Sequence, residues 1–91
     1  MPSKTIMLIN KKGLHARAAA KLATTAGQYQ CPIEVRCLGE SNWVDGKSVM
    51  SLMLLAAACG TELELNAEGE EAPDALAALC DLINDRFDEG E

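Results

Sequence analysis

Residues 4–26, KTIMLINKKGLHARAAAKLATTA, change their hydrophobic period once, and this change indicates a strand followed by a helix. The first part is apolar on both faces in its middle, which predicts a strand over residues 4–10, ended by the polar turn Asn10–Gly13. After the turn, small and apolar residues recur on one helical stripe, with Gly27 as a stop, so we expect a helix over 16–27. The stripe consists of Ala16, Ala19, Leu22, Ala23 and Ala26.

Three further strands are predicted from alternating or short apolar segments. Residues 31–37 and 61–67 alternate, as half-buried strands do, and residues 43–44 follow the turn Gly39–Asn42 closely enough to pair back as a short strand. The side chains expected to face the core are Ile33, Val35, Cys37, Leu63, Leu65 and Ala67.

Two more helices are predicted. Residues 47–57 are apolar around the whole helix axis, so part of this apolar surface must stay exposed. The last helix opens near Pro73 with acidic residues at its positive dipole end, and a solvated tail, residues 88–91, follows it. Its expected buried stripe is Leu76, Leu79, Cys80, Ile83 and Phe87.

The order of these elements is βαββαβα, and it predicts an α+β fold. We expect an open-faced sandwich in which a four-stranded antiparallel sheet is covered on one face by three helices. With 91 residues the chain is long enough for one domain, spanning residues 1–91.

Charge is divided unequally along the chain. Residues 1–47 carry seven Lys and Arg against three Asp and Glu, whereas residues 48–91 carry one against eleven. The acidic half would repel nucleic acid, and the basic half offers a surface to an acidic partner or a phosphate. We therefore expect no nucleic-acid or membrane role.

The cysteines indicate a reducing compartment. The four cysteines include no CxxC pair, and a single histidine cannot complete a zinc site with them. No leader-like segment opens the sequence, and its longest apolar stretch, residues 52–59, is too short to span a bilayer. We expect a cytoplasmic monomer without a metal or another cofactor.

His15 stands where the first turn ends and the first helix begins. The amides of residues 16–18 then lack partners within the helix, and with the positive dipole end they form an anion site to which Arg17 adds a guanidinium. The same field favours a neutral, nucleophilic imidazole. This arrangement suits a histidine that accepts and returns a phosphoryl group, although spacing alone also allows a surface histidine without a task.

Two motifs resemble the HPr phosphocarrier family of the bacterial phosphoenolpyruvate-dependent phosphotransferase system. They are Leu14-His15-Ala16-Arg17 before an alanine-rich helix and Lys47-Ser48-Val49-Met50 at the start of the second helix. The resemblance covers nearly the whole chain, including the Gly60–Leu63 and Gly69–Ala72 segments.

The resemblance implies a stoichiometric carrier rather than a turnover enzyme. His15 matches the histidine whose Nδ1 takes phosphate from phosphorylated Enzyme I and passes it to an enzyme IIA protein. Arg17 matches the arginine that steadies the phosphate, and Ser48 matches a serine that a kinase phosphorylates in some relatives.

Within the family, the chain looks more like the nitrogen-related branch, NPr, than the sugar-uptake branch. The acidic C-terminal half and the Arg86–Glu89 segment carry this likeness, and Ala18 replaces the proline of most sugar-branch members. Nitrogen-branch versions of Enzyme I and enzyme IIA are then the implied partners. The residues expected to dock them, beside His15, are Leu14, Ala20, Lys21, Lys47, Val49, Met50 and Met53.

Other classes of protein fit less well. Gly46-Lys47-Ser48 lacks the earlier glycine of a P-loop, because Ser41 occupies that position. An acyl carrier protein would be a helical bundle, and a hydrolase would need an acid–base pair that is not visible near His15. A docking module with the carrier fold but no phosphate transfer is a further alternative.

Overall fold

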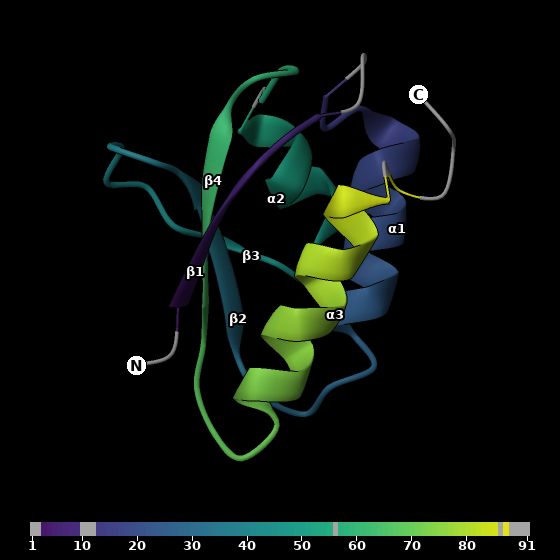
Figure 1. Cartoon of the computed structure of the whole chain (residues 1–91), viewed down its shortest axis with the longest axis vertical. Helices are drawn as coiled ribbons and strands as arrows, with labels where there is room; N and C mark the ends of the chain where they lie inside the picture. Colours follow the sequence, from purple (N-terminus) through teal and green to yellow (C-terminus); the bar gives the residue numbers. More distant parts are fainter. Residues whose placement is uncertain (1–2, 10–12, 56, 86, 88–91) are drawn as a thin grey trace.

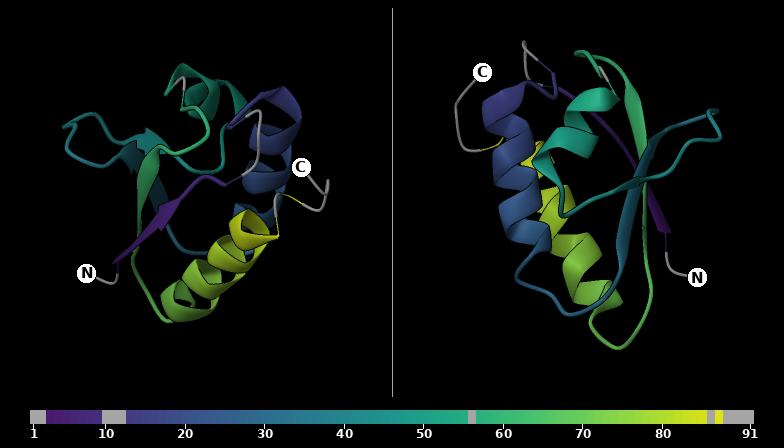
Figure 2. Two further views of the ribbon diagram at one scale, coloured as in Figure 1. Left: turned by 45° about the horizontal axis from the view of Figure 1, so that its top comes forward. Right: turned by 180° about the vertical axis from the view of Figure 1, so that it is seen from behind.

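The computed structural model describes residues 3–9, 13–55, 57–85 and 87, and this part of the chain has the predicted βαββαβα order (Figure 1). The elements are β1 (Ser3–Met7), α1 (Ala16–Ala26), β2 (Ile33–Cys37), β3 (Val44–Asp45), α2 (Val49–Leu54), β4 (Glu62–Ala67) and α3 (Ala72–Asn84). The strands form one antiparallel sheet in the order β1-β4-β2-β3. All three helices lie on one face of it (Figure 2), so the predicted open-faced sandwich is confirmed.

One face of the sheet is buried and the other exposed, because apolar and polar residues alternate along its strands as predicted. Leu63, Leu65 and Ala67 of β4 are buried, and Ile33 and Val35 of β2 lie in register with this row on the same face. Burying each of the leucine, isoleucine and valine side chains in this row stabilises the fold by roughly 1.5–3 kcal/mol. The intervening residues therefore point to the face that no helix covers.

Several element boundaries differ from the prediction. β1 ends at Met7 instead of reaching residue 10, although Leu8 still pairs with the turn before β4, donating to the Thr61 carbonyl at 2.9 Å. β2 begins at Ile33, because Pro32 has no N–H for the ladder. β3 covers residues 44–45 rather than 43–44. Residues 10–12 of the predicted turn Asn10–Gly13, and the predicted tail at 88–91, lie outside the described residues.

α1 buries a face of small side chains against the core. The buried residues are Ala18, Ala19, Leu22, Ala23 and Ala26. Ala16 was expected on this stripe but is exposed, because at 3.6 residues per turn it lies about 90° from the centre of the buried face. Ala18, missed by the prediction, lies just inside the other edge of that face.

The last helix ends earlier than its predicted stripe requires. Leu76, Leu79 and Ile83 are buried as expected, whereas Cys80 is only half-buried. α3 ends at Asn84, so Phe87 fills the core from beyond the helix, with a left-handed φ of 56°. The core thus extends beyond the end of the last helix.

None of the four cysteines is paired in a disulfide, and Cys59 is exposed. Among the described residues, no group of three or more His, Cys, Asp or Glu side chains is placed to hold a metal ion. No helix in the described ranges has the length and apolar character needed to cross a membrane.

Candidate functional site

His15 is the N-cap of α1, as predicted. Its backbone is extended, with φ −78° and ψ 178°, and its carbonyl accepts the first intrahelical hydrogen bond, from the Ala19 amide at 2.8 Å. The imidazole makes no capping hydrogen bond to the helix, and no acidic residue lies in the first turn. The positive end of the helix dipole therefore lies at the half-exposed His15 and is not offset by a carboxylate of the first turn, which is the electrostatic setting of an anion site.

Gly13 fixes where the turn before His15 runs. It is buried with a φ of +63°, and a Cβ built on it would lie 2.5 Å from the Ala57 carbonyl oxygen and 2.6 Å from Ala58 Cα. The Leu14 amide donates to the same Ala57 carbonyl at 2.9 Å. The turn is therefore held tightly against the segment that follows α2, a link that the sequence analysis did not foresee.

Leu14 is placed differently from expectation. It was predicted to dock a partner, but its side chain is only 5% exposed and belongs to the core. A leucine directly before an N-cap commonly packs against its own helix, and the buried side chain of Leu14 ties the turn to the core. Leu14 therefore offers almost no surface to a partner protein.

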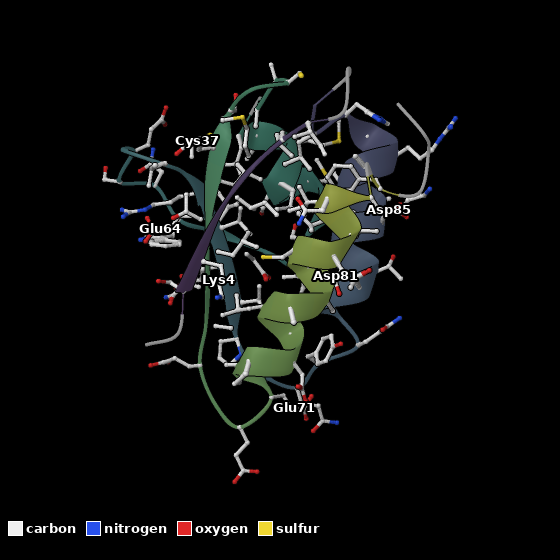
Figure 3. All side chains as sticks on the ribbon, in the orientation of Figure 1. Lys4, Cys37, Glu64, Glu71, Asp81 and Asp85 are labelled. Carbon is white, nitrogen blue, oxygen red and sulfur yellow. The ribbon has the colours of Figure 1, made fainter. Side chains whose placement is uncertain are left out.

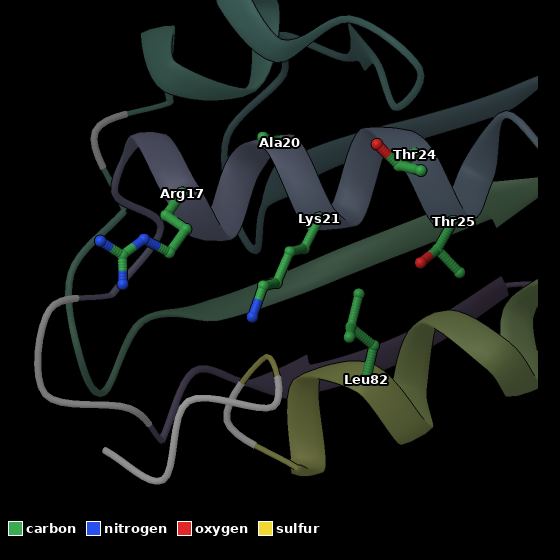
Figure 4. A pocket seen from close by; sticks show the side chains of 6 residues that line it. All are labelled: Arg17, Ala20, Lys21, Thr24, Thr25 and Leu82. Carbon is green, nitrogen blue, oxygen red and sulfur yellow. The ribbon is translucent and has the colours of Figure 1, made fainter.

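Arg17 and Lys21 share one side of α1. With Ala20, Thr24, Thr25 and Leu82 of α3 they line a pocket of about 350 Å³ (Figure 4). The Lys21 ammonium donates to the Phe87 carbonyl at 2.7 Å, which attaches Phe87, beyond the end of α3, to α1. Two cations thus follow His15 along the helix, on a surface that an acidic partner or a phosphate would favour.

Ser48 is the N-cap of α2. Its Oγ accepts a hydrogen bond from the Ser51 amide at 3.3 Å, so the serine satisfies one of the free donors of this helix. The preceding Lys47 is also held in place, because its ammonium donates to the Tyr29 carbonyl at 2.7 Å and its amide donates to Asp45 Oδ1 at 2.9 Å.

The predicted exposed apolar surface of α2 is confirmed. Leu52 alone of this helix is buried, Val49 is half-buried, and Met50 and Met53 are 79% and 45% exposed. Leu54, which the sequence analysis did not single out, is 81% exposed. The sequence could have predicted the exposure of Leu54, because a six-residue helix with apolar side chains around its whole axis must expose more of them than its methionines. α2 packs beside α1 (Figure 2), so this surface belongs to the same helical layer as His15.

A family model described as the PTS HPr component phosphorylation site matches residues 2–85. This chain belongs to the HPr family. HPr proteins are the phosphocarriers of the phosphotransferase system, in which they work with Enzyme I and enzyme IIA proteins.

Similar HPr proteins come from several bacteria. The chain is 57% identical to the phosphocarrier protein HPr of Pseudomonas aeruginosa and 48% identical to that of Neisseria meningitidis, over 91 residues and the full length of each protein. Among solved structures, HPr of Thermoanaerobacter tengcongensis superposes with a TM-score of 0.91 at 39% identity, covering 98% of both chains. HPr of Bacillus anthracis superposes with a TM-score of 0.82 at 32% identity, covering 90% of this chain and 95% of that one.

Proposed function

We propose that His15 is the phosphoryl acceptor of this HPr-family protein. A ring nitrogen, Nδ1 in the family resemblance, attacks phosphorus with its lone pair as the bond to the phosphorylated donor, Enzyme I, breaks. The reverse exchange passes the group to an enzyme IIA protein. The observation that carries this proposal is the place of His15, half-exposed at the positive end of α1 with no acidic residue in the first turn.

Arg17 and the first amides of α1 would hold the phosphoryl oxygens. Arg17 is exposed in the first turn, where the amides of residues 16–18 have no acceptor within the helix. Charge-assisted hydrogen bonds from a guanidinium and from helix amides strengthen as charge develops on the transferred group. Ala18 in place of proline leaves this cradle intact, because alanine favours the helix.

Partner proteins would dock on the helical layer around His15. The proposed surface combines the exposed methionines and Leu54 of α2 with cations on α1 and directly before α2, and it leaves out the buried Leu14. Its residues are Ala20, Lys21, Lys47, Val49, Met50, Met53 and Leu54. Flexible methionine side chains suit a carrier that must bind a donor and an acceptor in turn.

Ser48 has a structural role in this proposal. Its hydrogen bond to the Ser51 amide supports a capping function, which phosphate could keep because its oxygens also accept from helix amides. Phosphorylation of Ser48 by a kinase would act on docking, by repelling acidic partner surfaces.

We further propose that residues 1–91 form one carrier domain of the nitrogen-related branch. The acidic C-terminal half and the Arg86–Glu89 segment support this assignment. The output would then be regulatory, through nitrogen-branch partners, and the protein would work in the cytoplasm as a monomer. Sugar uptake is the alternative, and a docking module that carries no phosphate is another.

Phosphorylation by the two Enzyme I types tests function and branch together. The purified protein is mixed with phosphoenolpyruvate, magnesium and Enzyme I of either branch, and its intact mass is followed beside His15→Ala. We expect the gain of one acid-labile phosphate, absent from the variant and faster with the nitrogen-branch enzyme. Faster gain with the sugar-branch enzyme would reassign the branch, and no gain with either would leave a docking module.

A further inference from the structure

The sheet face that the helices leave uncovered is acidic. Four carboxylates lie on the outward side of the strands, alternating with the buried residues: Glu34, Asp45, Glu62 and Glu64. Figure 3 shows Glu64 on the side of the sheet away from α1 and α3. Among the described outward residues of the strands, Arg36 is the one cation, and its Nη2 lies 2.7 Å from Glu64 Oε1.

Two of these carboxylates oppose each other. Glu34 of β2 and Asp45 of β3 are direct cross-strand partners, and both are exposed. Like charges in this position destabilise a sheet. Arg36 does not neutralise them, because its guanidinium is bonded to Glu64 and stacks 4.4 Å from the Trp43 ring centre. A cation supplied from outside would relieve this repulsion.

Apolar side chains border the same acidic face. Met7 of β1 is the register partner of Glu62, and the Leu38 amide donates to the Glu62 carbonyl at 2.9 Å, so the two apolar residues flank this carboxylate. Met7 is 45% exposed and Leu38 48%. The connection between β2 and β3 projects on this side, away from the helices (Figures 1 and 2). Apolar anchors and carboxylates therefore share one uncovered surface.

We propose that this open sheet face docks a basic amphipathic helix of a partner protein. Such a helix would add the missing layer on the sheet, with apolar side chains against Met7 and Leu38 and Lys or Arg beside Glu34 and Asp45. The proposed phosphoryl-transfer surface lies in the helical layer on the other side of the sheet, so both partners can bind at once. The inference does not depend on the proposed phosphate transfer.

A peptide titration tests the docking face. The probe is a synthetic helical peptide of about 18 residues, or five turns, with a leucine stripe bordered by Lys and Arg. Followed by NMR on the ¹⁵N-labelled protein, we expect saturable binding with a Kd of roughly 100 µM or tighter, with shifts at Arg36, Glu62 and the Trp43 indole. The same leucine stripe bordered by glutamates should not bind.

Matched variants separate this face from general charge attraction. Glu34→Lys with Glu62→Lys should weaken binding at least about tenfold, whereas the control pair Glu70→Lys with Asp81→Lys, which changes net charge equally, should stay within about twofold. Should the first pair unfold, as circular dichroism would show, Glu34→Gln with Glu62→Gln replaces it and should weaken binding about threefold or more.

Three results would overturn the proposal. They are shifts confined to α2 around Met50 and Leu54, equal weakening by the variants on and off the sheet face, and the absence of saturable binding. The first would make α2 the apolar docking surface for such helices, and the second would reduce the effect to net charge.

Discussion

At the scale of single residues, Gly13 is the position that the site tolerates least. Gly13→Ala adds a methyl group where the Ala57 carbonyl oxygen lies 2.5 Å away, and it forces a left-handed φ on alanine. Because the obstacle is backbone, the turn before His15 must move. We expect a loss of about 3 kcal/mol in the free energy of unfolding, measured with urea, and slower phosphorylation of His15.

Gly39→Ala is the matched control, because Gly39 also has a positive φ, +91°, but a Cβ there meets nothing within 4 Å. It should cost only the backbone strain, about 1 kcal/mol. Equal losses in the two variants would show that close packing at Gly13 is unimportant.

The sequence predicted the place of His15 from local turn and helix signals. The Gly13 contact, by contrast, joins segments 44 residues apart in the chain, which no local pattern reveals.

At the scale of elements, α2 should determine how fast the donor binds. Met50 is 79% exposed, so Met50→Glu should leave the stability of the fold nearly unchanged. A carboxylate in the apolar surface formed with Met53 and Leu54 should lower phosphoryl transfer from Enzyme I about tenfold at limiting donor concentration. Rapid-quench measurement of phosphorylated protein gives this rate.

Leu38→Glu is the control, because it also adds a carboxylate at an exposed apolar residue but does so away from α2. Leu38 adjoins the open sheet face and is 48% exposed. Leu38→Glu should accept phosphate from Enzyme I at the rate of the unchanged protein. If Met50→Glu also kept this rate, the docking surface would not lie on α2.

The sequence predicted that α2 exposes apolar surface, because apolar residues surround its whole axis. The predicted helix, residues 47–57, was nevertheless too long at both ends. The capping hydrogen bond of Ser48, which sets the start at Val49, depends on side-chain geometry that a hydrophobic pattern does not contain.

At the scale of the whole molecule, the fold joins distant segments through β4. This strand lies between β1 and β2 and pairs antiparallel with both, so a segment from the last third of the chain forms the middle of the sheet. Alternation in residues 61–67 predicted the strand and its inward side chains. The order of the elements predicted the open-faced sandwich, whereas the order of the strands within the sheet follows from tertiary packing, which no local period contains. Phe87 is buried as predicted, but it reaches the core from beyond the end of α3, which the helical spacing did not indicate.

The thiols of Cys37 and Cys80 make the stability of the packed fold depend on pH. Burial raises the pKa of Cys37, and the carboxylate of Glu40 raises it further. Burial also raises the pKa of Cys80, where Lys4 opposes the rise and Asp81 adds to it. Above the ordinary thiol pKa of about 8.5, the folded protein therefore holds more protons at these sites than the unfolded chain. Their contribution to stability is complete below this pH and is lost as pH rises through the raised values.

We therefore expect the free energy of unfolding to fall between pH 8 and pH 10 partly because of these thiols. Urea titrations under reducing conditions should show a smaller fall for Cys37→Ala with Cys80→Ala than for the unchanged protein. Cys59→Ala is the control, since Cys59 is exposed, and it should keep the original pH dependence. All other ionisable groups are common to the three proteins, so only the difference between them reports the half-buried thiols of Cys37 and Cys80. An equal fall in all three would mean that desolvation of Cys37 and Cys80 is too weak to link their ionisation to folding.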